Sequence, residues 1–341
     1  MSLLFFDGFD GYDTGTDLTN FGGWLATAEG SLTLSSTVRV GSGKSLQVGY
    51  SGTEVLPYKF AADQSTKTVY IGYSFYRSHS GNGTAILYTL DSAKSIQIQV
   101  KLNTSNILEL RDIGGTVLAT GTTVLSLNTH YWLEFKIKIA NAGGIFDCKL
   151  EGATEFTYSG DTQWRATDSF LYIFWTCNAP MQHYIIDDVY ICNSDGSVNN
   201  TYLGEQRAEL ITPESDNTIA WTRFSGATNA ASVDDAIGAP DDNSTYVYSS
   251  TTAQKDIYNL TTLSNVSTVA GVKLVTRAEK DDANPISFKH GIKSGGTDQQ
   301  ITYALGVGYA NFMDIFETSD GASTAFTTTT IDSLLSTIEV V

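Results

Sequence analysis

The sequence predicts an all-β protein built from two domains. Apolar residues alternate with polar residues over many short segments, which is the pattern of antiparallel strands that cover a core on one side. The 341-residue chain has 31 glycines and 5 prolines, which suits many tight turns, and long helical patterns are missing. A polar, glycine-containing run near residues 193–201 separates two strand-rich regions, so we expect two hydrophobic cores.

The first region shows strand patterns at short intervals. Residues 3–9 predict the first strand, which leads into a turn rich in glycine and aspartate. Strict alternation follows in residues 69–75, 96–102, 131–139 and 146–150, and residues 170–175 are apolar on both faces. A single open sheet of so many strands would leave one face and two long edges exposed. We therefore expect a two-sheet, jelly-roll sandwich.

A closing strand is predicted over residues 184–191, and the polar run 193–197 ends it. The predicted domains are therefore 1–195, a jelly roll, and 202–341, a mainly-β domain. Later strand patterns cover residues 269–278, 286–292, 301–307 and 309–316, followed by a short helical turn at Ile331, Leu334 and Leu335 and a last strand over 338–341.

Charge and cysteine content exclude several classes of partner. The net charge is −17; residues 1–198 carry 12 Lys and Arg against 19 Asp and Glu, and residues 199–341 carry 8 against 18. Both regions are acidic, which argues against nucleic-acid binding. Cys148, Cys177 and Cys192 form no C-x-x-C pair, so we expect neither a disulfide framework nor a zinc site. Cys148 alternates with Phe146 and Leu150, which predicts a buried thiol. The opening residues lack a signal-peptide pattern and no segment has the length of a membrane span, so we expect no membrane insertion.

Short motifs in both predicted domains resemble those of known proteins. Residues 5–10 (FFDGFD), 131–136 (YWLEFK) and 186–190 (IDDVY) resemble the concanavalin A-like, or laminin-G-like, jelly roll. Residues 203–207 (LGEQR), Trp221 and residues 240–247 (PDDNSTYV) resemble a C-terminal module of structural proteins of tailed bacteriophages. Thr324–Thr327 stands where that module has a tryptophan. The combined resemblance implies a tail, fibre or capsid-decoration protein with an N-terminal jelly roll.

Metal binding has only weak candidates. Asp7 and Asp10, with Asp13 and Asp17, lie in a glycine-rich segment that could supply oxygen ligands for calcium, although the spacing is not that of an EF-hand. Asp187 and Asp188 are adjacent on a predicted strand, where one side chain would point inward and need donors or a cation. For this pair a structural role, tying the last strand to a neighbouring loop, is favoured over a ligand site. We expect no cofactor, with calcium left open.

Catalytic patterns are not found in the sequence. Residues 41–45 (GSGKS) imitate a phosphate-binding loop, but a strand pattern follows them and not a helix. Glu151, Glu155 and Asp161 lack the alternate spacing that jelly-roll hydrolases use on one strand. His79, His130, His183 and His290 lie far apart in sequence, and nothing there suggests a catalytic triad. Among the aromatic residues, Tyr76, Tyr88, Trp164 and Trp175 are candidates for stacking on sugar rings.

We therefore expect a non-enzymatic virion structural protein of a tailed phage, made in the bacterial cytoplasm and placed at the tail, fibre or baseplate periphery. A capsid-decoration protein and a carbohydrate-binding, lectin-like module are the alternatives. Expected partners are copies of the same chain, other virion proteins and a host-surface glycan. The uncharged tracts 261–268 and 322–330 predict exposed strand edges that neighbouring copies would cover.

Overall fold

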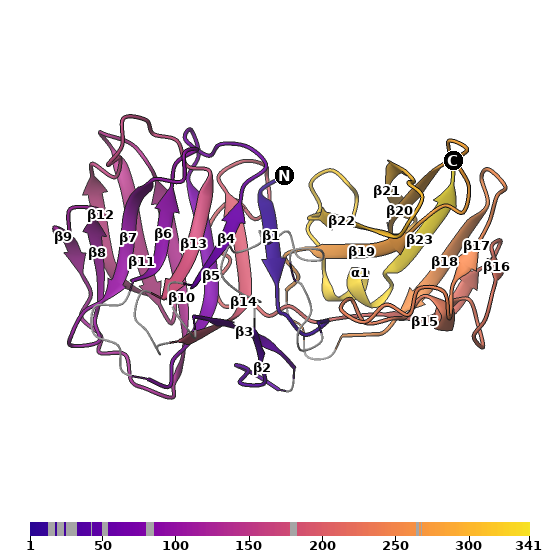
Figure 1. Ribbon diagram of the computed structural model, residues 1–341, viewed down its shortest axis with the longest axis horizontal. Coiled ribbons are helices and arrows are strands. Elements are labelled where there is room, and N and C mark those ends of the chain that lie inside the picture. The colour runs from indigo at the N-terminus through magenta and orange to yellow at the C-terminus, as the bar shows by residue number, and fades with distance from the viewer. Residues whose placement is uncertain are drawn as a thin grey trace. The chain divides into compact units, whose positions relative to one another are not determined.

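The computed structural model describes residues 1–12, 18, 24, 33–41, 43–49, 54–79, 85–177, 183–263, 266 and 268–341, with only the backbone at 54–57. The chain divides into two compact units, Met1–Ala208 and Glu209–Val341 (Figure 1). Strands make up 48% of the protein and helices 3%, so the prediction of an all-β fold is confirmed. In the described part of the chain, no helix is long and apolar enough to cross a membrane.

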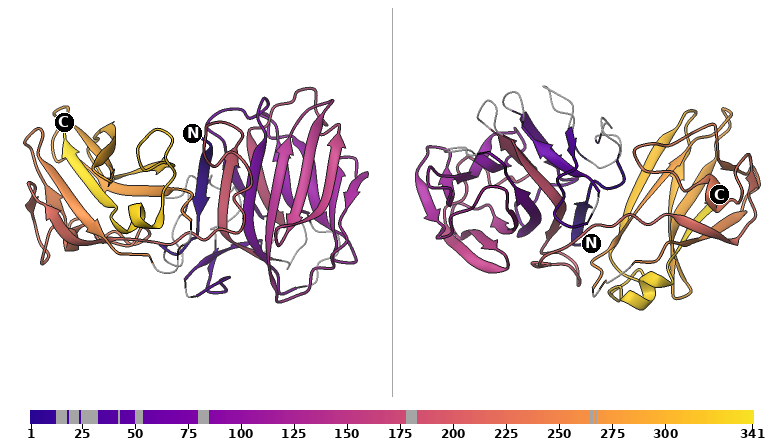
Figure 2. Two further views of the ribbon diagram at one scale, coloured as in Figure 1. Left: turned by 180° about the vertical axis from the view of Figure 1, so that it is seen from behind. Right: turned by 90° about the horizontal axis from the view of Figure 1, so that it is seen from below.

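The first unit is a sandwich of two antiparallel sheets (Figures 1 and 2). Among the described residues, eight strands form the larger sheet, in the order β12-β11-β10-β5-β14-β3-β2 with β1 paired to β14. Their bounds are β1 Leu3–Asp7, β2 Thr33–Ser35, β3 Ser45–Val48, β5 Val69–Tyr76, β10 His130–Lys138, β11 Gly144–Leu150, β12 Ala153–Gly160 and β14 Tyr184–Asn193.

The smaller sheet has the order β4-β13-β6-β7-β8-β9 in the described residues. Its strands are β4 Glu54–Lys59, β6 Ala85–Leu90, β7 Ile96–Leu102, β8 Leu108–Asp112, β9 Val117–Thr120 and β13 Tyr172–Cys177. The sheets meet through rings such as those of Tyr73 and Trp175, whose centroids lie 6.0 Å apart. The Tyr184 hydroxyl of β14 also donates to the Ile86 carbonyl of β6.

The alternation read from the sequence sets which side chains enter this core. Leu133, Phe135 and Ile137 of β10 are fully buried, as are Val69, Ile71 and Tyr73 of β5. Burying these side chains removes large apolar areas from water, which stabilises each by about 1.5–3 kcal/mol. All three cysteines are buried and none of them forms a disulfide, and the burial of Cys148 agrees with its strand pattern.

The second unit contains a five-stranded sheet in the order β15-β18-β23-β20-β21, counted over the described residues, and two-stranded ribbons β16-β17 and β19-β22. The strands are β15 Pro213–Thr218, β16 Thr222–Arg223, β17 Val247–Tyr248, β18 Lys255–Leu260, β19 Val272–Ala278, β20 Ser287–Ser294, β21 Thr297–Ala304, β22 Ala310–Phe316 and β23 Leu335–Val340. A 3-10 helix, η2, covers Ala230–Ser232, and the helix α1 covers Thr328–Asp332.

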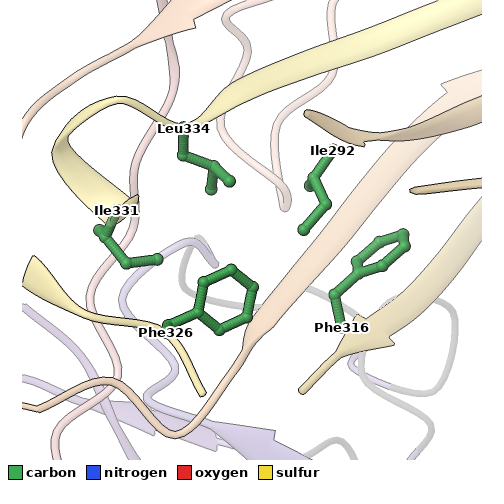
Figure 3. Close-up of a cluster of buried hydrophobic side chains, with 5 residues drawn as sticks. All are labelled: Ile292, Phe316, Phe326, Ile331 and Leu334. Carbon is green, nitrogen blue, oxygen red and sulfur yellow. The ribbon is translucent and has the colours of Figure 1, made fainter. Parts of the chain in front are cut away.

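The core of the second unit is small. Ile292, Phe316, Phe326, Ile331 and Leu334 pack together, and α1 supplies Ile331 to this cluster (Figure 3). Thr327 caps α1 through its hydroxyl, which accepts from the Thr330 amide. The helical turn predicted from Ile331 and Leu334 is therefore present, although Leu335 already belongs to β23.

Two expectations about chain organisation need correction. The sequence places residues 202–208 in the second domain, but the structure assigns them to the first unit. Tract 322–330 is not a strand edge: the Asp320 carboxylate accepts from the amides of Ala322, Ser323 and Thr324, and this turn leads into α1. Of tract 261–268, residues 264, 265 and 267 lie outside the described residues.

Candidate functional site

A segment of the chain covers part of the outer face of the larger sheet. We call residues 202–208 the cover segment. The Gly204 amide donates to Glu134 Oε1 (2.9 Å), and the Leu203 amide donates to the Tyr190 hydroxyl (3.1 Å). The Tyr190 hydroxyl donates in turn to Glu134, which is 1% exposed. Side chains at the centre of this face therefore already have partners.

Asp187 and Asp188 hold the same face to a neighbouring loop. A β-bulge lies between Asp187 and Tyr190, and Asp188 has a left-handed φ of 53°, so strict alternation is broken and both carboxylates reach Arg39. Asp187 Oδ2 accepts from the Arg39 amide (3.2 Å), and Asp188 Oδ2 accepts from the Arg39 guanidinium (3.0 Å). Burial and the charge of Asp188 raise the pKa of Asp187 to about 7. The expectation that the two aspartates point to opposite faces is therefore wrong, and the structural tie to a loop is present.

The other metal candidates serve turns. Asp7 accepts from the Phe9 amide and the Tyr12 hydroxyl, and Asp10 accepts from the Lys44 amide. Asp13 and Asp17 lie outside the described residues. So does Ser42, which belongs to the segment 41–45 that imitates a phosphate-binding loop. Within the described ranges, no group of three or more His, Cys, Asp and Glu residues is placed to hold a metal ion. Residues 45–48 form strand β3, as expected for a turn followed by a strand.

The smaller sheet presents a different outer face. Strand register places Phe174 opposite Tyr88, Tyr88 opposite Gln99, and Gln99 opposite Arg111. We call these four residues the cross-strand row; it crosses β13, β6, β7 and β8 (Figure 1). Because residues directly opposite in antiparallel strands share a face, the row lies on one side of the sheet.

This face points away from the core. The neighbours of the row along each strand, Ile173, Leu87, Val100 and Leu110, are 0–1% exposed and fill the sandwich interior. Phe174, Tyr88 and Arg111 are half-buried, while Gln99 is 5% exposed and donates to the Asp112 carbonyl (2.8 Å). The row therefore lies on the outer face, with three of its side chains partly open to solvent.

Charged and amide groups extend the row along β7 and β8. Lys101 lies opposite Glu109, two residues from Gln99 and Arg111 respectively and on the same face. Glu109 Oε2 accepts from Arg111 Nη2 (2.6 Å), and Glu109 Oε1 accepts from Asn103 Nδ2 (2.7 Å). Burial acts to raise the pKa of Glu109, but hydrogen bonds from Asn103 and Arg111 hold the pKa below its ordinary value. The face thus presents a carboxylate, a guanidinium and an ammonium beside two aromatic rings.

A loop borders this face. Gln97, on the same side of β7, donates to the Thr167 carbonyl and accepts from the Arg165 amide. The loop brings Trp164, which is 47% exposed, beside Gly114 in the turn between β8 and β9. An exposed indole therefore stands at the border of the face.

The four sugar-stacking candidates from the sequence lie in three different places in the structure. Tyr88 and Trp164 lie on or beside the outer face of the smaller sheet. Trp175 is fully buried in the core, so its candidacy is wrong. Tyr76 lies on the larger sheet, with its ring tilted against that of His130 and the two centroids 4.6 Å apart. Phe174, Gln99 and Arg111 were not singled out by the sequence; their joint placement depends on pairing between strands distant in the chain.

Carboxylates and histidines that the sequence left without partners have them in the structure. Glu151 accepts from the Trp132 amide, and Glu155 accepts from the amides of Thr122 and Thr123. The His79 and His183 rings are 4.9 Å apart. His290 is fully buried, with Nε2 2.6 Å from Asp314 Oδ2 and Nδ1 2.8 Å from Thr276 Oγ1. The last arrangement joins β19, β20 and β22 and was not expected.

Comparison with known proteins gives structural likeness only. No family model and no curated protein matches the chain. Similar solved structures include an endo-β-1,4-glucuronan lyase from the fungus Trichoderma reesei (14% identity, 52% of this chain, 93% of that chain, TM-score 0.40). They also include the alginate lyase AlgAT5 of polysaccharide lyase family 7 (15% identity, 50% of this chain, 85% of that chain, TM-score 0.38). A third is the carbohydrate-binding module CBM66 from Bacillus subtilis (17% identity, 50% of this chain, 95% of that chain, TM-score 0.34).

These matches add nothing to the tailed-phage part of the resemblance. Matches to polysaccharide lyases contradict the expectation that the protein is not an enzyme, and that expectation is withdrawn.

Proposed function

We propose that the protein binds carbohydrate through the outer face of the smaller sheet of its first unit. The cross-strand row carries this proposal. Phe174 and Tyr88 lie side by side and supply apolar ring surface for the C–H face of a pyranose. Arg111, which Glu109 holds in place, and Lys101 supply donors for sugar hydroxyls on the same face.

Two further observations favour this face and this class of ligand. On the larger sheet, the cover segment engages Glu134 and Tyr190, so a ligand there would have to displace hydrogen bonds already formed. The net charge of −17 opposes nucleic acid, whose phosphates would be repelled. A carbohydrate needs no positive field, since stacking and hydrogen bonds to hydroxyls suffice.

The names of the similar structures point to the same ligand class, because a carbohydrate-binding module and polysaccharide lyases occur among them. Their TM-scores lie below 0.5, and the side chains of the cross-strand row carry the proposal.

The test is binding of the full chain to an array of neutral and uronate-containing oligosaccharides, followed by calorimetric titration of the best ligand. Tyr88→Ala and Arg111→Met each weaken binding by about tenfold, since each removes one stacking or charge-assisted contact. Lys136→Met, which removes one positive charge from strand β10 of the larger sheet, is the control and leaves the affinity unchanged. An array without any bound sugar, or equal affinity in all variants, would overturn the proposal.

Polysaccharide lyase activity is a second candidate, favoured by a phenol, an amide and a guanidinium in adjacent positions at Tyr88, Gln99 and Arg111. In β-elimination a base removes the proton beside the uronate carboxylate. The electron pair of that C–H bond forms a C=C bond, the C–O bond to the leaving sugar breaks, and the departing oxygen takes up a proton from the Tyr88 hydroxyl or from water. A group that binds the carboxylate stabilises the charge that develops. Polyuronates incubated with the protein would develop ultraviolet absorbance from the new double bond, and Tyr88→Phe would abolish it. Absence of absorbance on all polyuronates tested would exclude this activity for them.

We further propose that this carbohydrate-binding protein is a homo-oligomeric component of a tailed-phage virion, at the tail periphery or on the capsid. What supports this is the resemblance of residues 5–10 and 240–247 to such proteins. Mass spectrometry of purified particles tests it: the chain is expected at several copies per particle, and its absence would contradict the placement.

A further inference from the structure

The second unit carries exposed aromatic rings on one face of the β16-β17 ribbon. Thr222 pairs with Tyr248 and Arg223 with Val247, and the Phe224 amide donates to the Tyr246 carbonyl (3.0 Å). Phe224 therefore lies opposite Tyr246, with Tyr248 two residues further on the same face. Phe224 is 58% exposed and Tyr248 is 50% exposed.

These rings form a platform and not a set of isolated exposed residues. The Phe224 and Tyr246 rings are nearly parallel, with an interplanar angle of 9° and centroids 4.6 Å apart. The Tyr248 centroid lies 6.0 Å from that of Tyr246. Tyr246 thus covers one face of the Phe224 ring, and much of Phe224 remains in contact with water. Clustered apolar area of this kind is a mark of a binding surface.

The loop 241–245, which leads directly into Tyr246, supplies the polar border of the platform. Arg277 of β19 forms a two-pronged ion pair with Asp242 and holds its guanidinium carbon 4.8 Å from the centre of the Tyr309 ring. The Tyr309 hydroxyl donates to Asn243 Oδ1 (3.3 Å). Burial first, and then the charges of Glu279 and Asp242, raise the pKa of Tyr309, and proximity to Tyr246 adds to this shift. Asp242 and Asn243 stand only a few residues before Tyr246 in the chain, so the border and the platform are adjacent.

The border is held in place before any ligand arrives. Asp241 accepts from both the amide and the hydroxyl of Thr245, which closes the loop that carries Asp242 and Asn243. Asp242 has a left-handed φ of 50°, a conformation that aspartate tolerates better than most residues. The hydrogen bond from Arg277 lowers the pKa of Asp242, so its carboxylate stays charged. A site ordered in advance loses less entropy on binding.

We propose that this platform, Phe224, Tyr246 and Tyr248 with Asp242, Asn243, Arg277 and Tyr309 as its polar border, is a second saccharide-binding site. It is separate from the face of the first unit and does not depend on that proposal. The open face of Phe224 suits the C–H face of a pyranose. The carboxylate, amide and guanidinium match hydroxyl groups, which both donate and accept.

Other flat or rigid ligands fit less well. Residues 199–341 carry 8 basic against 18 acidic side chains, so a nucleic acid would be repelled. A proline-rich peptide also docks on aromatic rows, but its imide backbone offers acceptors and few donors. The acceptors of Asp242 and Asn243 would then gain no partner.

The test uses the full chain with ring-¹³C-labelled phenylalanine and tyrosine, and linear oligosaccharides of glucose, mannose, galactose and N-acetylglucosamine as probes. Phe224→Leu and Tyr248→Leu identify the two signals by their loss. At least one oligosaccharide is expected to shift both signals in a saturable manner. Phe224→Ala, followed at the Tyr248 signal, weakens this binding by about tenfold, as for loss of one stacking ring. Ile219→Ala, an exposed apolar residue of the same unit, is the matched control and has no effect.

Arg277→Lys weakens binding as well, because lysine keeps the charge but loses the two-pronged geometry. The same titration in Arg111→Met, which alters only the first unit, gives an unchanged dissociation constant, so failure of one site is distinguished from failure of the other. The proposal is overturned if no oligosaccharide shifts the two signals, if Phe224→Ala leaves the affinity unchanged, or if a proline-rich peptide shifts them and the oligosaccharides do not.

Discussion

The ring of Tyr190 occupies the space where a side chain at Gly72 would begin. A Cβ added at Gly72 would lie 2.1 Å from Tyr190 Cε1, and the two residues are paired across β5 and β14. The ring is held on its far side as well, since its hydroxyl contacts Glu134 and the Leu203 amide. Because glycine has no side chain, the Tyr190 ring can lie against the backbone at Gly72, beneath the cover segment.

Gly72→Ala is expected to destabilise the first unit by about 3 kcal/mol, because neither backbone nor ring can move without breaking hydrogen bonds. Chemical denaturation followed by circular dichroism measures the change. Gly306→Ala is the control, since a Cβ there meets nothing within 4 Å. A loss at Gly72 no larger than at Gly306 would show that Tyr190 is mobile.

Glu134→Ala is expected to release the cover segment. It removes the acceptor of the Gly204 amide and of the Tyr190 hydroxyl, in a position that is 1% exposed. Hydrogen exchange at residues 202–206 should accelerate by about tenfold or more, which corresponds to loss of one or two hydrogen bonds. Lys136→Met, two residues along the same face of β10, should leave this exchange unchanged. Equal protection in both variants would contradict the role given to Glu134.

Asp256 organises the loop before η2 in the second unit. Its fully buried carboxylate accepts from the amides of Ala220 and Trp221, from Asn229 Nδ2 and from the Tyr258 hydroxyl. Asp256→Ala leaves these donors unpaired and is expected to cost about 3 kcal/mol or more. Trp221 fluorescence reports the loosening of the loop. Asp282→Ala, at an exposed turn, serves as control and should change stability by less than about 0.5 kcal/mol; a similar cost for both would refute this account of Asp256.

His290 gives the second unit a pH dependence. Burial lowers the pKa of His290 below its ordinary 6.5, and the hydrogen bond and charge of Asp314 offset only part of this. His290 therefore binds a proton more readily in the unfolded chain than in the folded one. The stability that the neutral, buried His290 contributes is complete above pH 6.5 and is lost as the pH falls below that value.

The free energy of unfolding, measured between pH 5 and 8, should fall toward acid more steeply in the wild type than in His290→Gln. Groups facing the ring are Asp314, Thr276 and the rings of Phe288 and Tyr303. Thr276→Val keeps the histidine and should keep the slope. Parallel pH profiles for the wild type and His290→Gln would contradict the assignment.

Local patterns predicted most of the strands and the buried faces. The alternation in residues 131–139 and 96–102 corresponds to β10 and β7, because side-chain direction in a strand follows from sequence alone. Side-chain direction does not follow this rule at the bulge at Asp188. One extra residue there changes the face of the sheet on which the following side chains lie.

Most of the candidate site could not be predicted from the sequence, because it depends on pairing between strands that are far apart in the chain. Phe174 and Tyr88 are brought together by the pairing of β13 with β6, across more than eighty residues of sequence. The cover segment could not be assigned either, because its polar composition reads as a linker while its amides bond to Glu134 and Tyr190. Trp175 was misjudged for a related reason: exposure of one aromatic residue depends on which sheet lies above it.

The most direct measurement of the central claim is the position of a bound oligosaccharide. The full chain is crystallised or studied by NMR with the sugar that binds most tightly in the array. The account predicts a sugar ring stacked on Phe174 or Tyr88, with hydroxyls hydrogen-bonded to Arg111 or Lys101. A sugar on the outer face of the larger sheet, or no sugar on the cross-strand row in a chain that binds carbohydrate, would contradict it.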